Sequence, residues 1–163
     1  EVPVGFKHIS AGMEAQHALI DGESSGGLTV RGHISGKDGL YAATLLVEMI
    51  SVTGKKLSEL VLDLFRRFGE MHTAEYDWPL TKELRDEIYH TVMEEQRLPD
   101  FGRKIEKISW MDGCKVYLEG GWVITRFSGT EPRVRIFAEA ETEKEAQRLV
   151  GIMANHTGLA WED

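Results

Sequence analysis

The sequence predicts an α/β segment followed by an α+β unit that contains an antiparallel four-stranded sheet and two helices. Two observations carry this prediction. Apolar residues recur at helical spacing between residues 40 and 68. From Ile105 to Ala140 the pattern changes to short strand-like runs separated by Asp-Gly and Gly-Gly pairs, which are typical hairpin turns. The change of period therefore separates a first part containing long helices from a strand-rich second part.

The first part is expected to contain a strand, a glycine-rich loop and two helices. The apolar run at 17–21 predicts a buried strand that enters the loop at 22–27. A helix is expected over 39–53, capped by Asp38 and ended by a glycine. A second helix is expected over 57–68, also ended by a glycine.

A linker is expected at 71–80, because this segment is mixed and polar and has no apolar period. It would join a first domain over 1–70 to a second domain over 81–163. Thr81 and Thr142 are expected to cap the two helices that flank the strands of the second domain, the latter in a capping box.

Composition limits the function. The net charge of −8 and the pI near 5.3 argue against a general nucleic-acid or membrane-surface role, so we expect no nucleic-acid or membrane partner. Cys114 is the only cysteine, which excludes an internal disulfide and favours a cytoplasmic location. The six histidines show no metal-ligand spacing, and we expect no metal in this chain. The segment that begins at Glu1 reads like the middle of a domain, so we expect a fragment of a longer protein.

The most informative stretch is residues 126–135, which reads Arg-Phe-Ser-Gly-Thr-Glu-Pro-Arg-Val-Arg. Guanidinium forks, hydroxyls and the N–H groups of a glycine turn suit a phosphate monoester. If 122–126 and 134–138 pair as a hairpin, these donors converge at one mouth. An ordinary solvated hairpin, whose arginines pair with acidic neighbours such as Glu131 and Glu139, is the alternative. The candidate phosphate contacts are Arg126, Ser128, Gly129, Thr130 and Arg135.

These residues carry a resemblance to a known family. The stretch resembles the phosphate-binding loop in the last domain of the α-D-phosphohexomutase superfamily. The loop at 22–27, Gly-Glu-Ser-Ser-Gly-Gly, is similar to the family's sugar-binding loop, and residues 32–40 resemble the segment that follows it. Residues 2–7 resemble the upstream loop of the third domain. The similarity covers nearly the whole chain in the family's order.

The resemblance implies that this chain is the end of domain 3 plus all of domain 4 of a four-domain enzyme. In the family, a phosphoserine in domain 1 donates the phosphoryl group, and aspartates in domain 2 hold Mg²⁺. Neither loop is present here, so the chain alone is expected to be inactive. The intact enzyme is expected to need Mg²⁺ and a hexose 1,6-bisphosphate, with hexose phosphate and the missing N-terminal domains as partners. Phosphoglucomutase is favoured over phosphomannomutase.

The resemblance also assigns sugar contacts to Glu23 and Ser25, since a carboxylate can accept hydrogen bonds from neighbouring sugar hydroxyls. Lys7 and His33 are further candidates. Lys37 matches a lysine that lies close to the reacting phosphate, where it would support catalysis. The alternatives are a polar turn at the loop, a surface charge at Lys37 and a backbone-satisfied histidine at His33.

Two other functions remain open from the sequence. One is a free-standing, non-enzymatic phosphosugar-binding module that reuses the same loops. The other is a generic anion-binding α+β domain without sugar preference. Arg133 occupies a position where the family tolerates a basic residue, and it is interpreted as electrostatic support or as a solvated surface charge.

Overall fold

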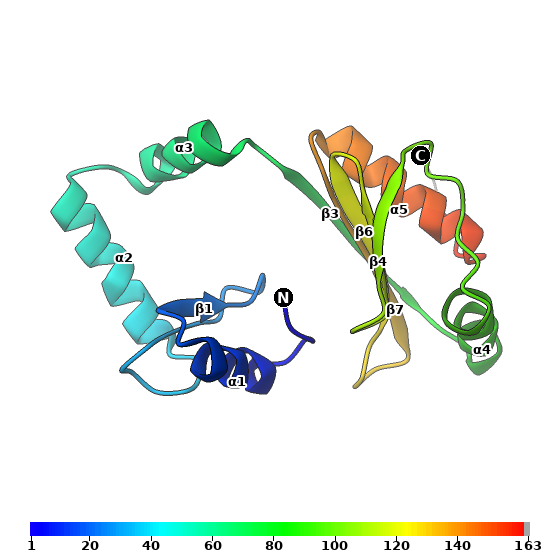
Figure 1. The fold of residues 1–163 in the computed structure, drawn as a ribbon, viewed down its shortest axis with the longest axis horizontal. Helices are drawn as coiled ribbons and strands as arrows, with labels where there is room; N and C mark the ends of the chain where they lie inside the picture. Colours follow the sequence, from blue (N-terminus) through cyan, green and yellow to red (C-terminus); the bar gives the residue numbers. More distant parts are fainter. Residues whose placement is uncertain (162–163) are drawn as a thin grey trace. The chain divides into compact units, whose positions relative to one another are not determined.

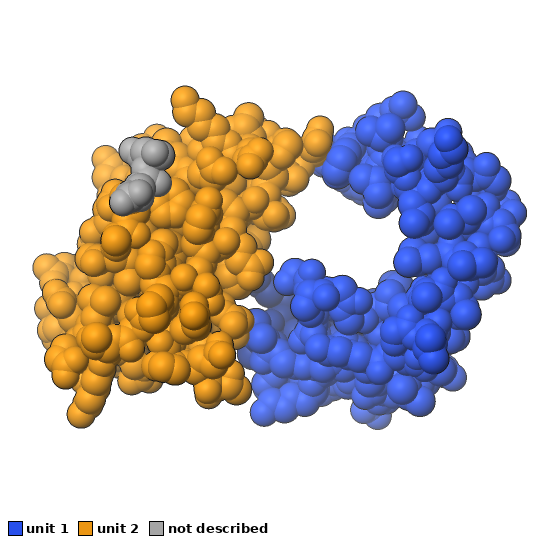
Figure 2. Space-filling view, turned by 180° about the vertical axis from the view of Figure 1, so that it is seen from behind, with its two compact units in different colours: residues 1–69 blue, residues 70–163 orange. Residues whose placement is uncertain are grey.

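The computed structural model describes residues 1–161, and the chain divides into two compact units (Figures 1 and 2). The first unit is Glu1–Gly69 and the second is Glu70–Asp163. Among the described residues, no helix combines the length and the apolar character needed to cross a bilayer.

The first unit consists of three helices and a two-stranded antiparallel ribbon. Its second helix begins where the Asp38 carboxylate accepts a hydrogen bond from the Tyr41 backbone N–H at 3.0 Å, and it ends at Gly54 with φ 65°. Both helices predicted from the apolar stripes are confirmed. The elements are α1 (Phe6–Gln16), β1 (Ile20–Gly22), β2 (Leu28–Val30), α2 (Gly39–Thr53) and α3 (Leu57–Phe68).

The buried strand predicted at 17–21 is wrong in position and in burial. The strand is β1 at 20–22, whose residues are exposed or half-buried, and His17 instead ends α1 with φ 51°. The sequence did not reveal α1, because it buries only Ile9 and Met13 and so carries a weak apolar stripe.

The helices α2 and α3 bury no residue, although both are rich in large apolar side chains. Leu40 is 84% exposed and Phe68 is 78% exposed. A helix with such a stripe normally covers an apolar partner. The apolar faces of both helices are therefore uncovered in the described structure, and their other exposed apolar side chains include Leu46, Val47, Ile50, Val52, Val61 and Leu64.

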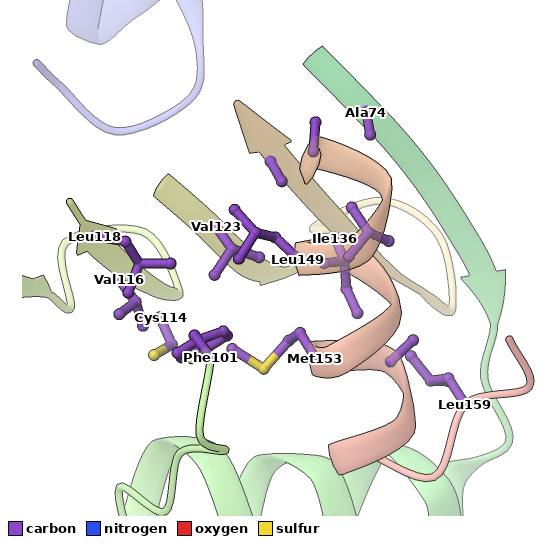
Figure 3. Close-up of a cluster of buried hydrophobic side chains, with 14 of the residues drawn as sticks. Ala74, Phe101, Cys114, Val116, Leu118, Val123, Ile136, Leu149, Met153 and Leu159 are labelled. Carbon is purple, nitrogen blue, oxygen red and sulfur yellow. The ribbon is translucent and has the colours of Figure 1, made fainter. Parts of the chain in front are cut away.

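The second unit is a five-stranded antiparallel sheet with α5 packed on one face (Figure 3). The strand order is β3-β7-β6-β5-β4, so the predicted number of four strands is wrong. The predicted meander and both predicted helices are present. The elements are β3 (His72–Pro79), α4 (Lys82–Ile88), the π-helical turn η1 (Tyr89–Glu94), β4 (Ile105–Ser109), β5 (Cys114–Leu118), β6 (Gly121–Phe127), β7 (Arg133–Ala140) and α5 (Glu143–His156).

The additional strand, β3, lies where the sequence predicted a linker at 71–80. It pairs with β7 along its whole length, from His72 opposite Ala140 to Pro79 opposite Arg133. An edge strand leaves much of its surface in water, so its apolar pattern is weak, and a proline is tolerated at its end. The polar composition that suggested a linker is thus the composition of an edge strand.

The helix caps of the second unit are confirmed in part. Thr81 accepts a hydrogen bond from the Leu84 N–H, and Thr142 accepts one from the Glu145 N–H, both at 3.2 Å. The Glu145 side chain pairs with Arg103 at 2.8 Å and with Arg148 at 2.7 Å. These contacts replace the hydrogen bond from the Thr142 backbone N–H to Glu145 that a complete capping box would contain.

The core lies between the sheet and α5 (Figure 3). Leu149 and Met153 of α5 are fully buried against the inner face of the strands, where Val123 and Ile136 are also fully buried. Burial of such side chains supplies roughly 1.5 to 3 kcal/mol each. One polar group in this layer is unsatisfied: within the described residues the buried Thr125 hydroxyl has no hydrogen-bond partner.

We predict that Thr125→Val stabilises the second unit. The substitution removes a buried hydroxyl without a partner and retains the branched shape, so the free energy of unfolding should rise by about 1 kcal/mol. Denaturant unfolding of the whole chain checks this. Thr157→Val is the matched control, because the buried Thr157 hydroxyl donates to the Met153 carbonyl at 2.9 Å and the change should destabilise. Equal destabilisation by both variants would contradict the prediction.

Candidate functional site

The candidate phosphate-binding loop, residues 128–132, joins β6 to β7 as predicted. Hydrogen bonds between its own polar groups hold its conformation. The Ser128 N–H donates to the Arg133 carbonyl at 2.9 Å and closes the loop. The Ser128 hydroxyl accepts hydrogen bonds from the N–H groups of Thr130 and Glu131 at 3.4 and 3.3 Å. Such a serine-centred turn holds the backbone of the tip in one conformation.

Two contacts outside the loop hold its ends. The Leu80 N–H, just before α4, donates to the Pro132 carbonyl at 2.8 Å. The Phe127 ring lies 5.5 Å from the Arg85 guanidinium and 6.1 Å from the Tyr89 ring. The loop is thus anchored by α4 and η1 as well as by its own strands.

Arg126 and Arg135 are opposite each other in the register of β6 and β7. Their side chains lie on the sheet face away from α5, because Thr125, Val134 and Ile136 alternate with them and are buried. Directly opposed like charges destabilise a strand pair. A bound anion or a neighbouring carboxylate would relieve this repulsion.

Each of the three arginines in this region has an acidic neighbour. Arg126 Nε lies 3.4 Å from Asp112 Oδ2, and Arg133 Nη1 lies 2.9 Å from Asp77 Oδ2. Arg135 Nη2 is 3.9 Å from Glu131 Oε2, at the limit of an ion pair.

These ion pairs are what the solvated-hairpin alternative expects, although only Glu131 of its two named carboxylates takes part. The Glu139 carboxylate, expected there to pair with an arginine, accepts a hydrogen bond from Trp122 Nε1 at 3.0 Å. Glu131 reaches Arg135 only at the limit of an ion pair. A hollow of about 480 Å³ is lined by Glu75, Asp77 and Arg135, so Arg135 borders open space.

The glycine-rich loop brings three predicted residues together. Lys37 Nζ lies 2.6 Å from Glu23 Oε2, and the Ser25 hydroxyl donates to the same oxygen at 3.3 Å. The Glu23 N–H donates to the Gly27 carbonyl at 2.8 Å, which closes the loop. Glu23, Ser25 and Lys37 therefore form one polar cluster.

The glycine at position 27 lies under the Lys37 side chain. A Cβ there would lie 2.9 Å from Lys37 Cδ, so a larger residue would require the lysine stem to shift. Lys37 Nζ also lies 5.3 Å from the centre of the Phe6 ring. The hydrogen bond from Lys37 lowers the pKa of Glu23, which is therefore ionised at neutral pH and can accept hydrogen bonds.

His33 and Lys7 lie outside that cluster. His33 Nε2 is 2.9 Å from Asp38 Oδ2, and the His33 ring stacks on Tyr41 at 3.9 Å. The His33 side chain is thus paired with a carboxylate, whereas the alternative in the sequence analysis was a histidine paired with the backbone. The Tyr41 backbone N–H and then His33 lower the pKa of Asp38. Lys7 is exposed on the first turn of α1, and within residues 1–161 its side chain has no hydrogen bond or ion pair.

His33 also contributes to the wall of a hollow of about 270 Å³ in the first unit. Ser10 and Thr29 in this wall donate their hydroxyls to the carbonyls of Ser35 and Ile34, at 3.1 and 2.8 Å. These polar groups are occupied in holding the loop at 31–35.

No metal chemistry follows from the described part of the chain. Across residues 1–161, no group of three histidine, cysteine or carboxylate side chains could hold a metal ion. Burial raises the pKa of the Cys114 thiol to about 12, so this cysteine is not a thiolate ligand or nucleophile at neutral pH.

Sequence reasoning did not identify three residues of these sites. Asp112 was interpreted only as part of a hairpin turn, Asp77 fell in the expected linker, and Asp38 was assigned only as a helix cap. Counting the strand register back from Arg126 would have placed the turn at 112–113 beside it, because Cys114 pairs with Thr125. The sequence contains no comparable signal for Asp77, because its position beside the arginines follows only from the pairing of β3 with β7.

The chain matches two models of one family. Residues 1–68 match "phosphoglucomutase/phosphomannomutase, alpha/beta/alpha domain III", and residues 87–156 match "phosphoglucomutase/phosphomannomutase, C-terminal domain". A phosphoglucomutase/phosphomannomutase of Thermococcus kodakarensis is 32% identical over 90% of this chain. A phosphoglucosamine mutase of Bacillus licheniformis is 30% identical over 95% of it.

Solved structures agree with these matches. A Thermus thermophilus protein described only tentatively as a phosphomannomutase is 26% identical, with a TM-score of 0.71 over 96% of this chain and 30% of its own. A phosphoglucomutase/phosphomannomutase family protein of Burkholderia thailandensis shares the fold, with a TM-score of 0.68 over 99% of this chain and 33% of its own at 19% identity. The chain spans 30 to 31% of the length of the two sequence relatives.

We predict that Lys37→Gln raises the pKa of Glu23 toward its ordinary value of 4.5. Because the pKa of Glu23 is lowered in the folded chain, its pairing contributes stability above the ordinary pKa, and this contribution is lost as the pH falls through the lowered pKa. Carbon-13 NMR titration of the carboxyl groups measures the change. Lys7→Gln is the control and should leave the pKa of Glu23 unchanged. An unchanged Glu23 pKa in Lys37→Gln would show that the contact does not persist in solution.

Proposed function

Since the chain belongs to the phosphoglucomutase/phosphomannomutase family, we propose that it is the substrate-recognition portion of a phosphohexomutase. The intact enzyme would interconvert hexose 1-phosphate and hexose 6-phosphate, with glucose as the favoured sugar. The observation that supports this proposal most is that Arg126 and Arg135 are paired in register on one face of the sheet. An anion bound between them would offset the repulsion of their two positive charges.

In this proposal the β6–β7 loop binds the phosphate group that does not react. Arg126 and Arg135 would supply charge and forked donors, while the Ser128 and Thr130 hydroxyls and the Gly129 N–H would supply further donors. The hydrogen bonds of Ser128 support this role, because they hold the tip of the loop before a ligand arrives. A preformed loop loses less conformational entropy on binding.

The sugar hydroxyls would be bound by the glycine-rich loop. Glu23 is ionised and the Ser25 hydroxyl lies against it, so together they offer acceptors to adjacent sugar hydroxyls. Lys37 would support the reacting phosphate, and its 51% exposed side chain allows it to turn from Glu23 to a ligand. Lys7 and His33 are further proposed sugar contacts.

We also propose that the rest of the active site lies in preceding domains of the same polypeptide. The relatives are more than three times as long as the matched region, and α2 and α3 present uncovered apolar faces. The model that matches residues 1–68 describes an α/β/α domain, whose sheet would cover such faces. The phosphoserine and the Mg²⁺ site would belong to those domains. The reaction would also need hexose 1,6-bisphosphate, and a cytoplasmic location is proposed.

We predict that the chain alone does not catalyse the reaction. Incubation with glucose 1-phosphate, glucose 1,6-bisphosphate and Mg²⁺ should form no glucose 6-phosphate, measured by a coupled dehydrogenase assay. The full-length parent protein serves as the positive control. Turnover by the chain itself would contradict the proposed division of roles.

We predict that the chain nevertheless binds hexose phosphate. Arg126→Ala should weaken binding of glucose 1-phosphate by about 1.5 to 3 kcal/mol, the range for a charged hydrogen bond. In an NMR titration, glucose 1-phosphate should shift the backbone signals of Glu23 and Ser25, whereas inorganic sulfate should shift only the β6–β7 loop. Equal shifts by both ligands would indicate a generic anion site. The same titration with mannose 1-phosphate and glucosamine 1-phosphate ranks the sugars.

A further inference from the structure

Arg126 is less exposed than its partner in the proposed phosphate site. Its side chain is 13% exposed, whereas that of Arg135 is 32% exposed. An unconstrained arginine carries about 2 kcal/mol of rotamer entropy, and repulsion from the opposed arginine would drive the two side chains apart. A group that fixes the Arg126 guanidinium would offset both of these costs.

Asp112 is placed to do this. Its Oδ2 lies 3.4 Å from Nε of Arg126. A contact at Nε leaves the two terminal nitrogens available as a fork, which is the edge that binds phosphate in the bidentate mode. The carboxylate can thus orient Arg126 without occupying the edge needed by the ligand.

The backbone fixes the position of Asp112. The next residue, Gly113, has φ 97°, and a Cβ there would lie 2.3 Å from the Thr125 carbonyl oxygen. The turn between β4 and β5 therefore packs directly against the backbone of β6 at the residue before Arg126. Only glycine permits this approach, so the position of Asp112 beside Arg126 is set by the fold.

We infer that Asp112 is the positioning residue of the phosphate site: it orients Arg126 from the neighbouring turn and does not itself contact the ligand. The inference rests on the proposed function, since it assumes that Arg126 and Arg135 bind the phosphate group of the substrate.

The charge of Asp112 makes the inference testable. A carboxylate that is merely near the site repels an anion, so its neutralisation should strengthen phosphate binding. A carboxylate that positions Arg126 should have the opposite effect, because its neutralisation releases the guanidinium. Glu75 is the matched control: it carries the same charge and lines the hollow beside Arg135, but it pairs in register with Phe137 rather than with an arginine.

The experiment measures binding of inorganic phosphate and of glucose 1-phosphate to the whole chain by calorimetry, at fixed pH and ionic strength. Asp112→Asn should weaken binding of both ligands by about tenfold. This is the lower end of the effect of removing a residue that orients a metal-binding side chain. Glu75→Gln should leave binding unchanged or strengthen it. Asp112→Glu keeps the charge but moves the carboxylate, and it should also weaken binding.

A second readout follows Arg126 itself. The ¹⁵N NMR signal of its Nε–H group should shift in Asp112→Asn and not in Glu75→Gln, and denaturant unfolding of each variant verifies that the second unit remains folded. If Asp112→Asn unfolds it, Asp112→Glu provides the same comparison.

The outcomes separate this inference from the proposed function. If wild type binds neither ligand, or if Arg126→Ala binds them normally, the proposed phosphate site is wrong. If Arg126→Ala loses binding but both Asp112 variants bind as well as Glu75→Gln, only the positioning role of Asp112 is overturned.

Discussion

The register between β6 and β7 is the constraint on which the second unit depends. It places Val134 and Ile136 in the core and Arg135 opposite Arg126 on the outer face. Because side chains alternate along a strand, a slip of one residue would expose the apolar face and bury the arginines. The burial energy that stabilises the sheet therefore also enforces the arrangement of the proposed phosphate site. The same register, extended through β5, brings the turn at 112–113 beside Arg126.

Both proposed binding loops are held by ion pairs within the chain. Asp112 lies against Arg126 and Asp77 against Arg133, whereas Glu23 holds Lys37. An acidic chain with a net charge of −8 can thus present a local cationic site without a broad basic surface. The difference between the loops is geometric. The contact at Arg126 leaves its terminal nitrogens available, whereas Lys37 has a single ammonium group and would have to share it between Glu23 and a ligand.

Local signals were sufficient to predict much of the fold. Apolar stripes with glycine stops predicted α2 and α3, and Asp38, Thr81 and Thr142 cap their helices as expected. The edge strand β3 escaped prediction, because a half-solvated strand has little apolar alternation. The arginines were identified from their chemistry, and the roles of Glu23 and Lys37 were expected only by resemblance. The contributions of Asp77 and Asp112 depend on the packing of strands and turns, which the local sequence does not specify.

The central claim is that Arg126 and Arg135 together hold the phosphate group of a hexose phosphate. A crystal structure of the chain with glucose 1-phosphate tests it most directly. We expect phosphate oxygens within about 3 Å of both guanidinium groups and of the Gly129 N–H at the loop tip, with Asp112 still against Arg126 Nε. A phosphate bound elsewhere, with these two arginines contacting only protein carboxylates, would contradict it.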